Sequence, residues 1–567
     1  MSKYQIEILS TKTNLETVKV NGYLLHSKYD PIREAKMVAE REYEVLDVLI
    51  LFGYGLGYIA EAINNKIEKS QKLIIIDPLY KYLNSSISKT NFNIIYEYDQ
   101  KSIEYIVANS MNNLSQKIKV IVSPNYENIF KEELLELLKI IKNIQNVHKV
   151  MENTIKEFSD SWQENYIHNL IHLDEDSSLG KLKKMYNCPV ILISGGPSLT
   201  KQLQILDKIK KNVITIAAGS TINTLLEYGI EPDYIVTIDG GEVNYLHFKD
   251  IKNIKSELIF CLSSYYKIQD RYQNTKYAFL TPDDEDIQKY IKKVFDIELP
   301  IFSGGGSVAN FALSIASYIS TGPVAIIGQD LAYTDSKSHA ENNKNFLIID
   351  GKFQEENELF EVEGYSGEKV LTDYPLFSMK KDFERLNEIL SQSTMIFNCT
   401  EGGVKIERMQ QMSFIAFCNK YVNRDVQLNK IQSKQKFNTY NNSKLIDILL
   451  QEVKIYDELI RSLKLSLKIL ERNKSNVLFD KNVLKELNKV DKEFISKKDF
   501  TSINRIVDPI TIDVLRKFQP ISNENPEEKY RRVYNQNKEL YSRLQEAIEK
   551  TKGYTLDVIE KAKKYEV

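Results

Sequence analysis

Apolar and polar positions divide the 567-residue chain into three zones. Residues 1–150 alternate short apolar runs with stretches of helical periodicity, and residues 181–405 repeat a strand, loop and helix pattern. After about residue 406 the strand pattern disappears. The chain is therefore predicted to be an α/β protein with an N-terminal Rossmann-like domain (1–150), a central α/β domain (181–405) and a C-terminal all-helical domain (406–567). A linker helix over 151–180 is predicted from residues at four-residue spacing: Phe158, Trp162, Tyr166 and Leu170.

The helical domain carries the most regular pattern of the chain, an a/d seam over four heptads. This seam fits either a dimeric coiled coil or one helix of a small bundle. Apolar residues beside the seam, such as Leu450 and Leu459, favour the bundle because a two-stranded coil needs a narrower apolar face. Partner helices are predicted from Pro526 to Lys550 and after Gly553. The seam positions are Ile446, Leu449, Val453, Tyr456, Ile460, Leu463, Leu467 and Leu470.

The charge balance limits the partners of the chain. With 76 Lys and Arg against 78 Asp and Glu, the net charge of −2 excludes a chain that binds nucleic acid or an anionic membrane as a polycation. From Arg424 to Val567, 30 Lys and Arg face 22 Asp and Glu, so the helical domain is basic and the rest is acidic. The N-terminus lacks the apolar core of a signal peptide, and no run approaches the roughly 18 apolar residues of a membrane span. We therefore expect a soluble, cytoplasmic protein that binds no nucleic acid.

A glycine motif lies between the first two predicted parallel strands. Gly53, Gly55 and Gly57 follow a short apolar strand and precede a helix, and the next strand ends at Asp77. In Rossmann-type units such glycines let the backbone approach a ligand, and the acidic residue can hold a ribose. The spacing resembles nucleotide- and S-adenosylmethionine-binding domains. A working cofactor site and an inherited scaffold with an empty or altered pocket both fit, and the second is favoured because no methyltransferase-type motif follows.

A second glycine turn opens the central domain. A buried-strand run ending at Ile193 enters Ser194-Gly195-Gly196-Pro197-Ser198. Gly195 and Gly196 leave backbone N–H groups free to face a phosphate, and the Ser198 hydroxyl adds a donor. The turn is not a Walker A loop, because no Gly-Lys-Ser/Thr follows. A plain strand-to-helix turn is the alternative interpretation.

Two further strands are predicted to end beside this turn. Gly219 follows the strand Asn212–Ala218, and Asp239 follows the strand Tyr234–Ile238. Because the carboxyl ends of parallel strands form the ligand crevice of such sheets, we expect Ser194, Gly219 and Asp239 to cluster. Asp239 could bind a ribose or cytidine group, or it could cap the helix that follows.

A third glycine run precedes the amphipathic helix that extends to Tyr318. Its residues Ser303, Gly304, Gly305, Gly306 and Ser307 form a loop whose ordering is entropically costly. Such a loop indicates that something approaches its backbone closely, and an anion at the helix start is the natural candidate.

Two more strands complete the series of motifs. One ends in Gly328-Gln329-Asp330, with His339 shortly after, and the last ends in Asn398-Cys399-Thr400-Glu401-Gly402-Gly403. The five motifs occur together and in order: SGGPSL, the strand ending in DGG, GGGSVAN, GQDLAYT followed by SHA, and NCTEGG. Over residues 181–405 this combination resembles the motility-associated factor (Maf) flagellin glycosyltransferases.

The resemblance implies a cytoplasmic enzyme that transfers a nonulosonic acid of the pseudaminic or legionaminic type. The donor would be its CMP conjugate, the acceptor Ser or Thr of flagellin, and no further cofactor would be needed. The family's central domain is similar to small bacterial sialyltransferases, which implies a GT-A-like fold here. Together, motif and resemblance give the candidate donor site as Gly195, Gly196, Ser198, Gly219, Asp239, Ser303, Gly304, Gly305, Ser307, Gly328 and Glu401.

The catalytic candidates are His339 and Asp330. His339 lies within a family-like motif, and an imidazole pKa suits a base near neutral pH, so His339 is favoured over His247 as the base. The chain lacks a clear equivalent of the sialyltransferases' late catalytic histidine. Asp330 could position the base, bind the sugar, or serve only as a structural cap. Glu401 could contact the acceptor or the sugar.

Alternatives outside this scheme stay open. The acidic run Asp283–Asp286 could ligate a metal, but it starts a predicted helix, where acids favour the helix dipole. Metal-independent chemistry is therefore expected. An ATP-dependent pterin pyrophosphokinase-like enzyme and a non-enzymatic flagellin-binding protein are the competing functions. A homo-oligomer formed through the helical domain is a further expectation.

Overall fold

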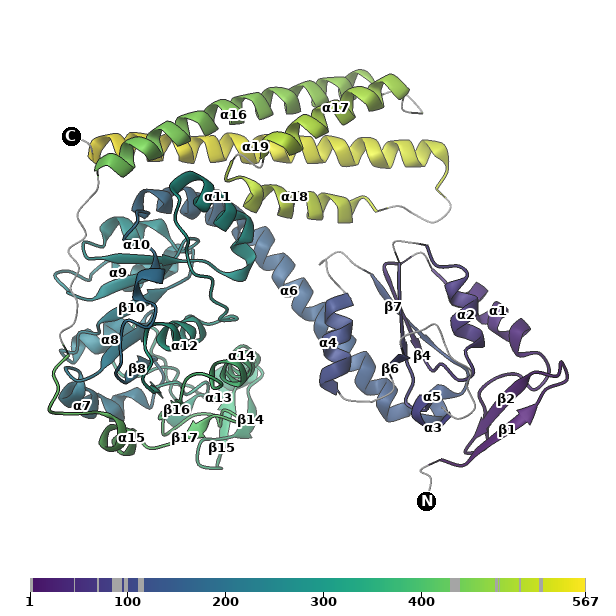
Figure 1. Ribbon diagram of the computed structural model, residues 1–567, viewed down its shortest axis with the longest axis horizontal. Coiled ribbons are helices and arrows are strands. Elements are labelled where there is room, and N and C mark those ends of the chain that lie inside the picture. The colour runs from purple at the N-terminus through teal and green to yellow at the C-terminus, as the bar shows by residue number, and fades with distance from the viewer. Residues whose placement is uncertain are drawn as a thin grey trace. The chain divides into compact units, whose positions relative to one another are not determined.

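The structure is a computed structural model that divides the chain into two compact units, Met1–Glu157 and Phe158–Val567 (Figure 1). It describes residues 4–44, 46–68, 71–83, 94–95, 100–110, 117–428, 439–474, 478, 480–498, 501–519 and 524–565. None of the described helices combines the length and the apolarity that crossing a membrane requires.

The N-terminal unit is built on a parallel sheet of order β6-β5-β4-β7 in its described residues. Its central strand β4 is apolar throughout because both faces are covered. The predicted strand, glycine loop and helix are present as β4, residues 53–57 and α2, which confirms the Rossmann-like unit. The elements are β1 (Ile6–Ser10), β2 (Glu16–Val20), β3 (Tyr23–Leu24), α1 (Pro31–Glu42), β4 (Val48–Phe52), α2 (Tyr58–Asn64), β5 (Lys72–Ile76), α3 (Tyr80–Leu83), β6 (Ile94–Ile95), α4 (Gln100–Ser110), β7 (Ile118–Val122), α5 (Tyr126–Ile129) and α6 (Lys131–Asn169), which ends in the second unit.

The second unit contains a parallel sheet whose described strands have the order β12-β11-β10-β9-β8-β13-β16-β17. β8 comes first in the chain, and the later strands add on both of its sides, so the strand order reverses between β8 and β13. In such sheets ligands bind at the carboxyl ends of the strands near this point. The strands are β8 (Val190–Ile193), β9 (Ile214–Ala218), β10 (Tyr234–Thr237), β11 (Glu257–Cys261), β12 (Lys276–Phe279), β13 (Val324–Ile327), β16 (Ile396–Asn398) and β17 (Gln410–Gln411), with a separate hairpin of β14 (Phe360–Glu363) and β15 (Lys369–Thr372).

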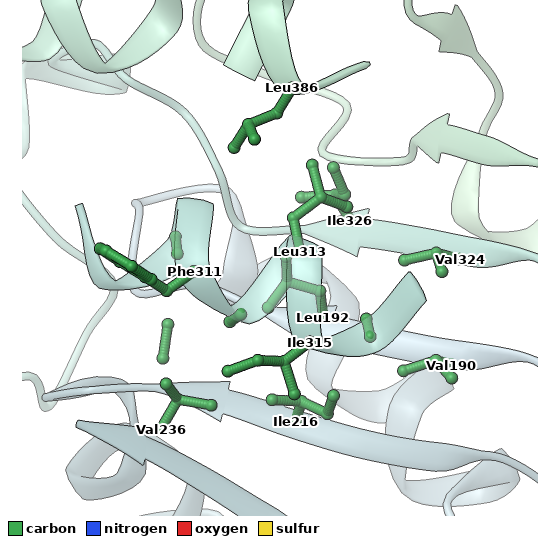
Figure 2. Packing of buried hydrophobic residues seen from close by; sticks show 14 of the residues in the cluster. Val190, Leu192, Ile216, Val236, Phe311, Leu313, Ile315, Val324, Ile326 and Leu386 are labelled. Carbon is green, nitrogen blue, oxygen red and sulfur yellow. The ribbon is translucent and has the colours of Figure 1, made fainter. Parts of the chain in front are cut away.

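Helices cover both faces of this sheet. On one face, α12 lies across the strands and buries Phe311, Leu313 and Ile315 against them (Figure 2). On the other face, α7 and α15 pack against the residues of β8 and β13 that point away from α12. The mixed α/β class is thus confirmed. The helices are α7 (Leu199–Ile209), α8 (Thr221–Glu227), α9 (Glu242–Phe248), α10 (Tyr266–Arg271), α11 (Glu285–Phe295), α12 (Val308–Ile319), α13 (Gly351–Glu356), α14 (Tyr374–Leu390) and α15 (Phe414–Tyr421).

The layer around the sheet continues beyond residue 405, where the sequence pattern ends the central domain. β17 pairs with β16, and Phe414 and Phe417 of α15 are buried in the core on the α7 face. The following segment is also attached, because the Asn212 side-chain amide donates to the carbonyls of Arg424 and Val426 at 3.1 and 2.8 Å. The short strand β17 and the irregular segment lack the apolar periodicity that the sequence analysis relied on.

The C-terminal helices form a bundle within one chain. Seam residues such as Tyr456 and Leu463 are buried in a core shared with α17, α18 and α19, which confirms the bundle interpretation of the heptads. A homo-oligomer through this seam would have to displace these helices, and the oligomer stays a prediction. The helices are α16 (Thr439–Arg472), α17 (Lys481–Lys498), α18 (Asn504–Lys517) and α19 (Pro526–Tyr565).

The predicted break at Gly553 is wrong, because α19 is one helix from Pro526 to Tyr565. A glycine in a helix interior costs about 1 kcal/mol relative to alanine. Here Thr551 and Thr555 on either side of it are fully buried. Packing against α16 therefore outweighs the local preference to end the helix.

The acidic run Asp283–Asp286 is tied into the fold at Asp284. This carboxylate is fully buried, and it accepts hydrogen bonds from the backbone N–H and the hydroxyl of Thr281, each at 2.7 Å. It also forms an ion pair with Arg505 of α18. Asp284 thus joins the sheet-containing part of the second unit to its helical part.

Candidate functional site

The glycine turn after β8 is held by the carboxylate of Asp330, which follows β13 and is 1% exposed. This carboxylate accepts hydrogen bonds from the backbone N–H of Ser198 at 3.2 Å and from its hydroxyl at 2.7 Å. The Thr334 hydroxyl donates to the second carboxylate oxygen at 2.7 Å. The Gly196 N–H donates to the Gly328 carbonyl at 2.7 Å. The donors of Gly196 and Ser198 that the sequence assigned to a phosphate are therefore engaged inside the protein, and Asp330 acts as the structural cap.

Close approach explains two glycines of this turn. A Cβ on Gly196 would overlap the Asp330 carboxylate, and a Cβ on Gly328 would overlap the Ser194 carbonyl. Gly328 also has a φ of +65°, a region that side chains disfavour. Burial raises the pKa of Asp330, while its hydrogen bonds from Ser198 and Thr334 act in the opposite direction. Gly196, Gly328 and Asp330 thus lock the ends of β8 and β13 together.

Unpaired donors lie beside Gly195 in the same turn. The Ser194 hydroxyl and Asn343 Nδ2 are on side chains that are each 5% exposed, and neither has a hydrogen-bond partner among the described residues. A Cβ placed on Gly195 would lie 3.1 Å from Asn343 Nδ2 and 3.2 Å from Thr221 Oγ1. Buried polar atoms without partners are rare and mark places that a ligand or water fills. Ser194 was expected at this ligand edge, whereas Asn343 was missed as a candidate.

His339 lies next to the same turn. Its Cδ2 atom would be 3.7 Å from a Cβ on Gly195, and the Ala340 N–H donates to the Gly195 carbonyl at 2.9 Å. Its Nδ1 atom is hydrogen-bonded to the Ser338 hydroxyl at 3.2 Å. Burial lowers the pKa of His339, and a hydrogen bond to the Asn345 backbone partly offsets this effect. The ring is therefore neutral near pH 7 and can accept a proton.

His247 lies on α9, close enough to His339 to lower its pKa further. It is 9% exposed, and its Nδ1 atom has no partner in the described part of the chain. Burial and the charge of Lys344 lower the pKa of His247. Lys344 donates to the Leu246 carbonyl at 2.8 Å and pairs with Asp250 at 3.1 Å, which fastens the segment carrying His339 to α9.

The loop that starts α12 meets the end of β9. A Cβ on Gly219, whose φ is +51°, would lie 3.7 Å from Val308 at the start of α12. The Gly306 N–H donates to the carboxylate of Asp382 at 3.3 Å, and a Cβ on Gly305 would overlap that carboxylate. The end of β9 therefore meets the start of α12 at Gly219 and Val308. As at Gly196, a carboxylate of the chain itself takes the position expected for an external anion.

The remaining residues of this loop have mainly structural contacts. Ser307 caps α12, accepting from the Ala309 N–H at 3.3 Å, and Ser303 accepts from the Ser314 hydroxyl through its carbonyl at 2.9 Å. Gly304 lies against the ring of Phe311, where a Cβ would overlap. Asn310, in the first turn of α12, is fully buried with both amide atoms unpaired among the described residues. It too was missed as a candidate, although it ends the GGGSVAN motif.

Asp239 follows β10, and its carboxylate has no hydrogen-bond donor in the described residues. Its backbone carbonyl accepts from Asn244 Nδ2 at 2.9 Å and from the Tyr265 N–H at 3.1 Å. α9 begins at Glu242 without a side-chain cap, so the capping alternative is wrong. The carboxylate is open to solvent, yet protein surrounds it closely enough to raise its pKa above the usual range.

The end of α6 supports the loops around Asp239. Asn165 Nδ2 donates to the carbonyls of Gly240 and Ser263 at 2.9 and 3.1 Å. One turn later, Asn169 Nδ2 donates to the carbonyls of Leu262 and Ser264 at 2.9 and 2.8 Å. Their spacing of four residues, on one face of the helix, was the available signal, but the aromatic residues of the same helix give the stronger pattern.

Glu401 is hydrogen-bonded to the start of α15. Its carboxylate accepts from the Phe414 N–H at 2.8 Å, at the start of α15. Gly403, two residues later, is packed against the backbone of Asp330. The NCTEGG motif thus supports α15 and Asp330.

The glycine loop of the N-terminal unit is filled by side chains of the chain itself. Asp77 is fully buried, and one of its oxygens accepts from the N–H groups of Tyr54 and Gly55 at 3.0 and 3.1 Å and from the Tyr126 hydroxyl at 3.0 Å. The other oxygen accepts from the Leu79 N–H at 2.7 Å. Asp77 is therefore not free to hold a ribose.

The three glycines of this loop face three rings. A Cβ on Gly53 would lie 2.6 Å from the ring of Tyr126, and one on Gly55 would lie 2.5 Å from His26 Nε2. A Cβ on Gly57 would lie 2.5 Å from the Tyr54 hydroxyl. The space that glycines leave for a nucleotide is occupied, which favours the altered-scaffold interpretation.

Mild acid is expected to destabilise this loop through His26. Nε2 of His26 accepts from the Leu56 N–H at 2.9 Å, a role that a protonated ring loses. Burial lowers the pKa of His26 from 6.5 to about 4. The unfolded chain therefore binds the proton first, so stability is complete above pH 6.5 and is lost as the pH falls towards 4. The expected loss in unfolding free energy is about 2 kcal/mol at pH 5.

Urea unfolding at pH 7.5 and pH 5, with hydrogen exchange in peptides covering residues 48–58, measures this loss. A His26→Gln variant offers an acceptor oxygen that does not titrate, so it should lose less stability between the two pH values. An equal loss in the wild type and in His26→Gln would contradict the assignment.

Two comparisons relate this arrangement to known proteins. The sequence profile of the family described as 6-hydroxymethylpterin diphosphokinase MptE-like matches residues 164–336. Among curated proteins, none matches the chain in sequence. The structure of the Maf glycosyltransferase from Magnetospirillum magneticum AMB-1 is similar with a TM-score of 0.58 at 13% identity, covering 99% of this chain and 91% of that one. The resemblance to Maf glycosyltransferases that the ordered motifs indicate is therefore confirmed in the fold, over almost the whole chain.

Proposed function

We propose that this protein is a glycosyltransferase that moves a nonulosonic acid from its CMP conjugate to Ser or Thr of flagellin in the cytoplasm. The observation that carries the proposal is the likeness in fold to a Maf glycosyltransferase over 99% of the chain. The five ordered motifs of the second unit add to it, because fold alone does not define chemistry. Pseudaminic and legionaminic acid are the donor sugars that the resemblance favours.

The unpaired donors beside Gly195 suit the phosphate of such a donor. Asn343 Nδ2 and the Ser194 hydroxyl are buried and unpaired in the described residues, so an anion there would gain hydrogen bonds without breaking any. Gly195 leaves room beside Asn343 that a side chain would narrow.

Transfer also needs a group that accepts the proton of the acceptor hydroxyl. His339 and Asp239 both fit this role by their ionisation. Burial lowers the pKa of His339, which keeps its ring neutral near pH 7 and able to accept a proton. The surrounding protein raises the pKa of Asp239, which makes its carboxylate a stronger base.

The intact mass of flagellin tests the proposal. Flagellin is co-expressed with this protein and with enzymes that make CMP-pseudaminic or CMP-legionaminic acid. We expect a mass increase of one or more nonulosonic acid residues, lost when this protein is omitted. Unmodified flagellin in the presence of folded protein and measured donor would overturn the proposal.

A pterin diphosphokinase is the second candidate, because the MptE-like profile matches residues 164–336. That enzyme would bind ATP with Mg²⁺, whereas the proposed transferase binds CMP. A rise in melting temperature with CMP, and none with ATP and Mg²⁺, supports the transferase. A flagellin-binding protein without activity would form a complex with flagellin and release no CMP.

A further inference from the structure

We propose that Asp239 is the catalytic base that takes the proton from the acceptor hydroxyl, and that His339 holds the phosphate oxygen that leaves with CMP. This assignment rests on the proposed function, because it concerns the transfer step of that reaction. It differs from the sequence-based expectation, in which the motif around His339 favours this histidine as the base.

The order of the strands separates the two groups. The glycine turn with its unpaired donors follows β8, whereas Asp239 follows β10, and β9 lies between them. Neighbouring strands are about 4.8 Å apart, so the two strand ends are separated by about 10 Å along the edge of the sheet. A phosphate at the turn and a sugar ring beside it would span such a distance. The acceptor hydroxyl would then reach the sugar at the side of Asp239.

The place of His339 argues for a different role. In an in-line displacement the nucleophile attacks the carbon on the side opposite to the leaving group. His339 lies beside Gly195 and is connected to it through Ala340, at the position proposed for the phosphate. A group at that position can hold the leaving oxygen of the phosphate, whereas Asp239 follows β10, two strands away from the turn, where we infer that the acceptor hydroxyl meets the sugar.

The described residues hold Asp239 in place and give its carboxylate no hydrogen-bond donor. Its carbonyl accepts two hydrogen bonds, from Asn244 and Tyr265, and the next carbonyl, of Gly240, accepts one from Asn165. A catalytic group works best when the residues around it fix its backbone and leave the group itself unpaired. The carboxylates of Asp330 and Asp382, by contrast, accept hydrogen bonds from the glycine turns themselves.

The proposed transfer forms one bond and breaks another. The oxygen of the acceptor Ser or Thr forms a bond with the anomeric carbon of the sugar, and its proton passes to the Asp239 carboxylate. The bond between that carbon and the CMP phosphate oxygen breaks, and its electron pair leaves with CMP. The protein around its solvent-open carboxylate raises the pKa of Asp239, which makes it a stronger base than a fully hydrated aspartate.

An Asp239→Asn variant of the full chain tests the assignment. Transfer from the CMP-pseudaminic or CMP-legionaminic donor that the wild type uses should slow about a hundredfold or more in kcat. The dissociation constant of CMP and the melting temperature should not change, because the carboxylate has no partner among the described residues and the proposed nucleotide site lies two strands away. His339→Ala should instead weaken the binding of CMP. Glu242→Gln is the matched control, since it removes an exposed carboxylate at the start of α9 and should leave both measurements unchanged.

Each outcome decides one assignment. Full transfer by Asp239→Asn would overturn the base assignment while leaving the proposed function intact. A parallel loss of CMP affinity in Asp239→Asn would make this residue a nucleotide contact and would also overturn it. A wild-type protein that transfers neither sugar to flagellin would overturn the proposed function and the assignment together.

Discussion

An Asp330→Ala variant is expected to lose about 3 kcal/mol of unfolding free energy, because three donors would lose their acceptor at once. The backbone N–H and the hydroxyl of Ser198, and the hydroxyl of Thr334, all donate to this carboxylate. Ser198 is 2% exposed, so water cannot replace the lost acceptor without opening the turn. Urea unfolding of the full chain, monitored by hydrogen exchange in peptides over residues 190–210, measures the effect.

Asp330→Asn is expected to cost much less, about 1 kcal/mol. The amide oxygen can keep the two donors of Ser198, and the amide nitrogen can donate to Thr334 after its hydroxyl turns round. This variant separates a structural carboxylate from a catalytic one. If Asp330 bound the sugar as a charged group, Asp330→Asn would abolish transfer at unchanged stability. Near-normal transfer and a small loss of stability are the results we expect.

The fold could be predicted from the sequence where apolar runs are continuous. The strands β4, β8, β9 and β13 are short, apolar and followed by glycine, and each lies where that pattern indicates. The same rule gave the carboxyl ends of the strands as the ligand edge. The last strand of the sheet could not be predicted in this way. β17 consists of two polar residues and is defined only by its pairing with β16.

The site was harder to predict because the hydrogen-bond donors of the glycine turns find their acceptors at residues far away in the chain. Glycine turns indicate backbone N–H groups that need an anion. The sequence does not tell whether the anion is a ligand or a side chain 132 residues away, as Asp330 is from Ser198. At Gly306 the partner is Asp382, and at Gly55 it is Asp77. The more useful signal is a polar side chain beside such a turn that has no hydrogen-bond partner among the described residues.

Asn343 shows what such a signal requires. Its position after the SHA motif is unremarkable in the sequence, and it becomes a candidate only when its amide nitrogen is found buried and unpaired beside Gly195. Asp239 is the converse case. From the sequence, Asp239 could either contact a ligand or cap the following helix. The start of α9 has no side-chain cap, which rules out the second role.

Asp77→Asn is expected to destabilise the N-terminal unit by about 3 kcal/mol, far more than the same substitution at Asp330. Both oxygens of Asp77 face backbone N–H groups: those of Tyr54 and Gly55 on one side and that of Leu79 on the other. A backbone N–H cannot reverse its direction as a hydroxyl can. Whichever way the new amide is oriented, its NH₂ group would face a donor inside a fully buried site.

The measurement is hydrogen exchange in peptides over residues 48–83, compared between the wild type, Asp77→Asn and Asp330→Asn. We expect faster exchange there in Asp77→Asn, and no change there in Asp330→Asn, whose contacts all lie in the second unit. A protein whose N-terminal loop bound a nucleotide through Asp77 would behave differently, since the free protein would keep its stability and lose only the ligand. Unchanged exchange in Asp77→Asn together with lost binding of a nucleotide would therefore restore the cofactor interpretation. Because the glycine loop already contains a carboxylate, a hydroxyl and an imidazole from its own chain, the loss of stability is the result that the contacts require.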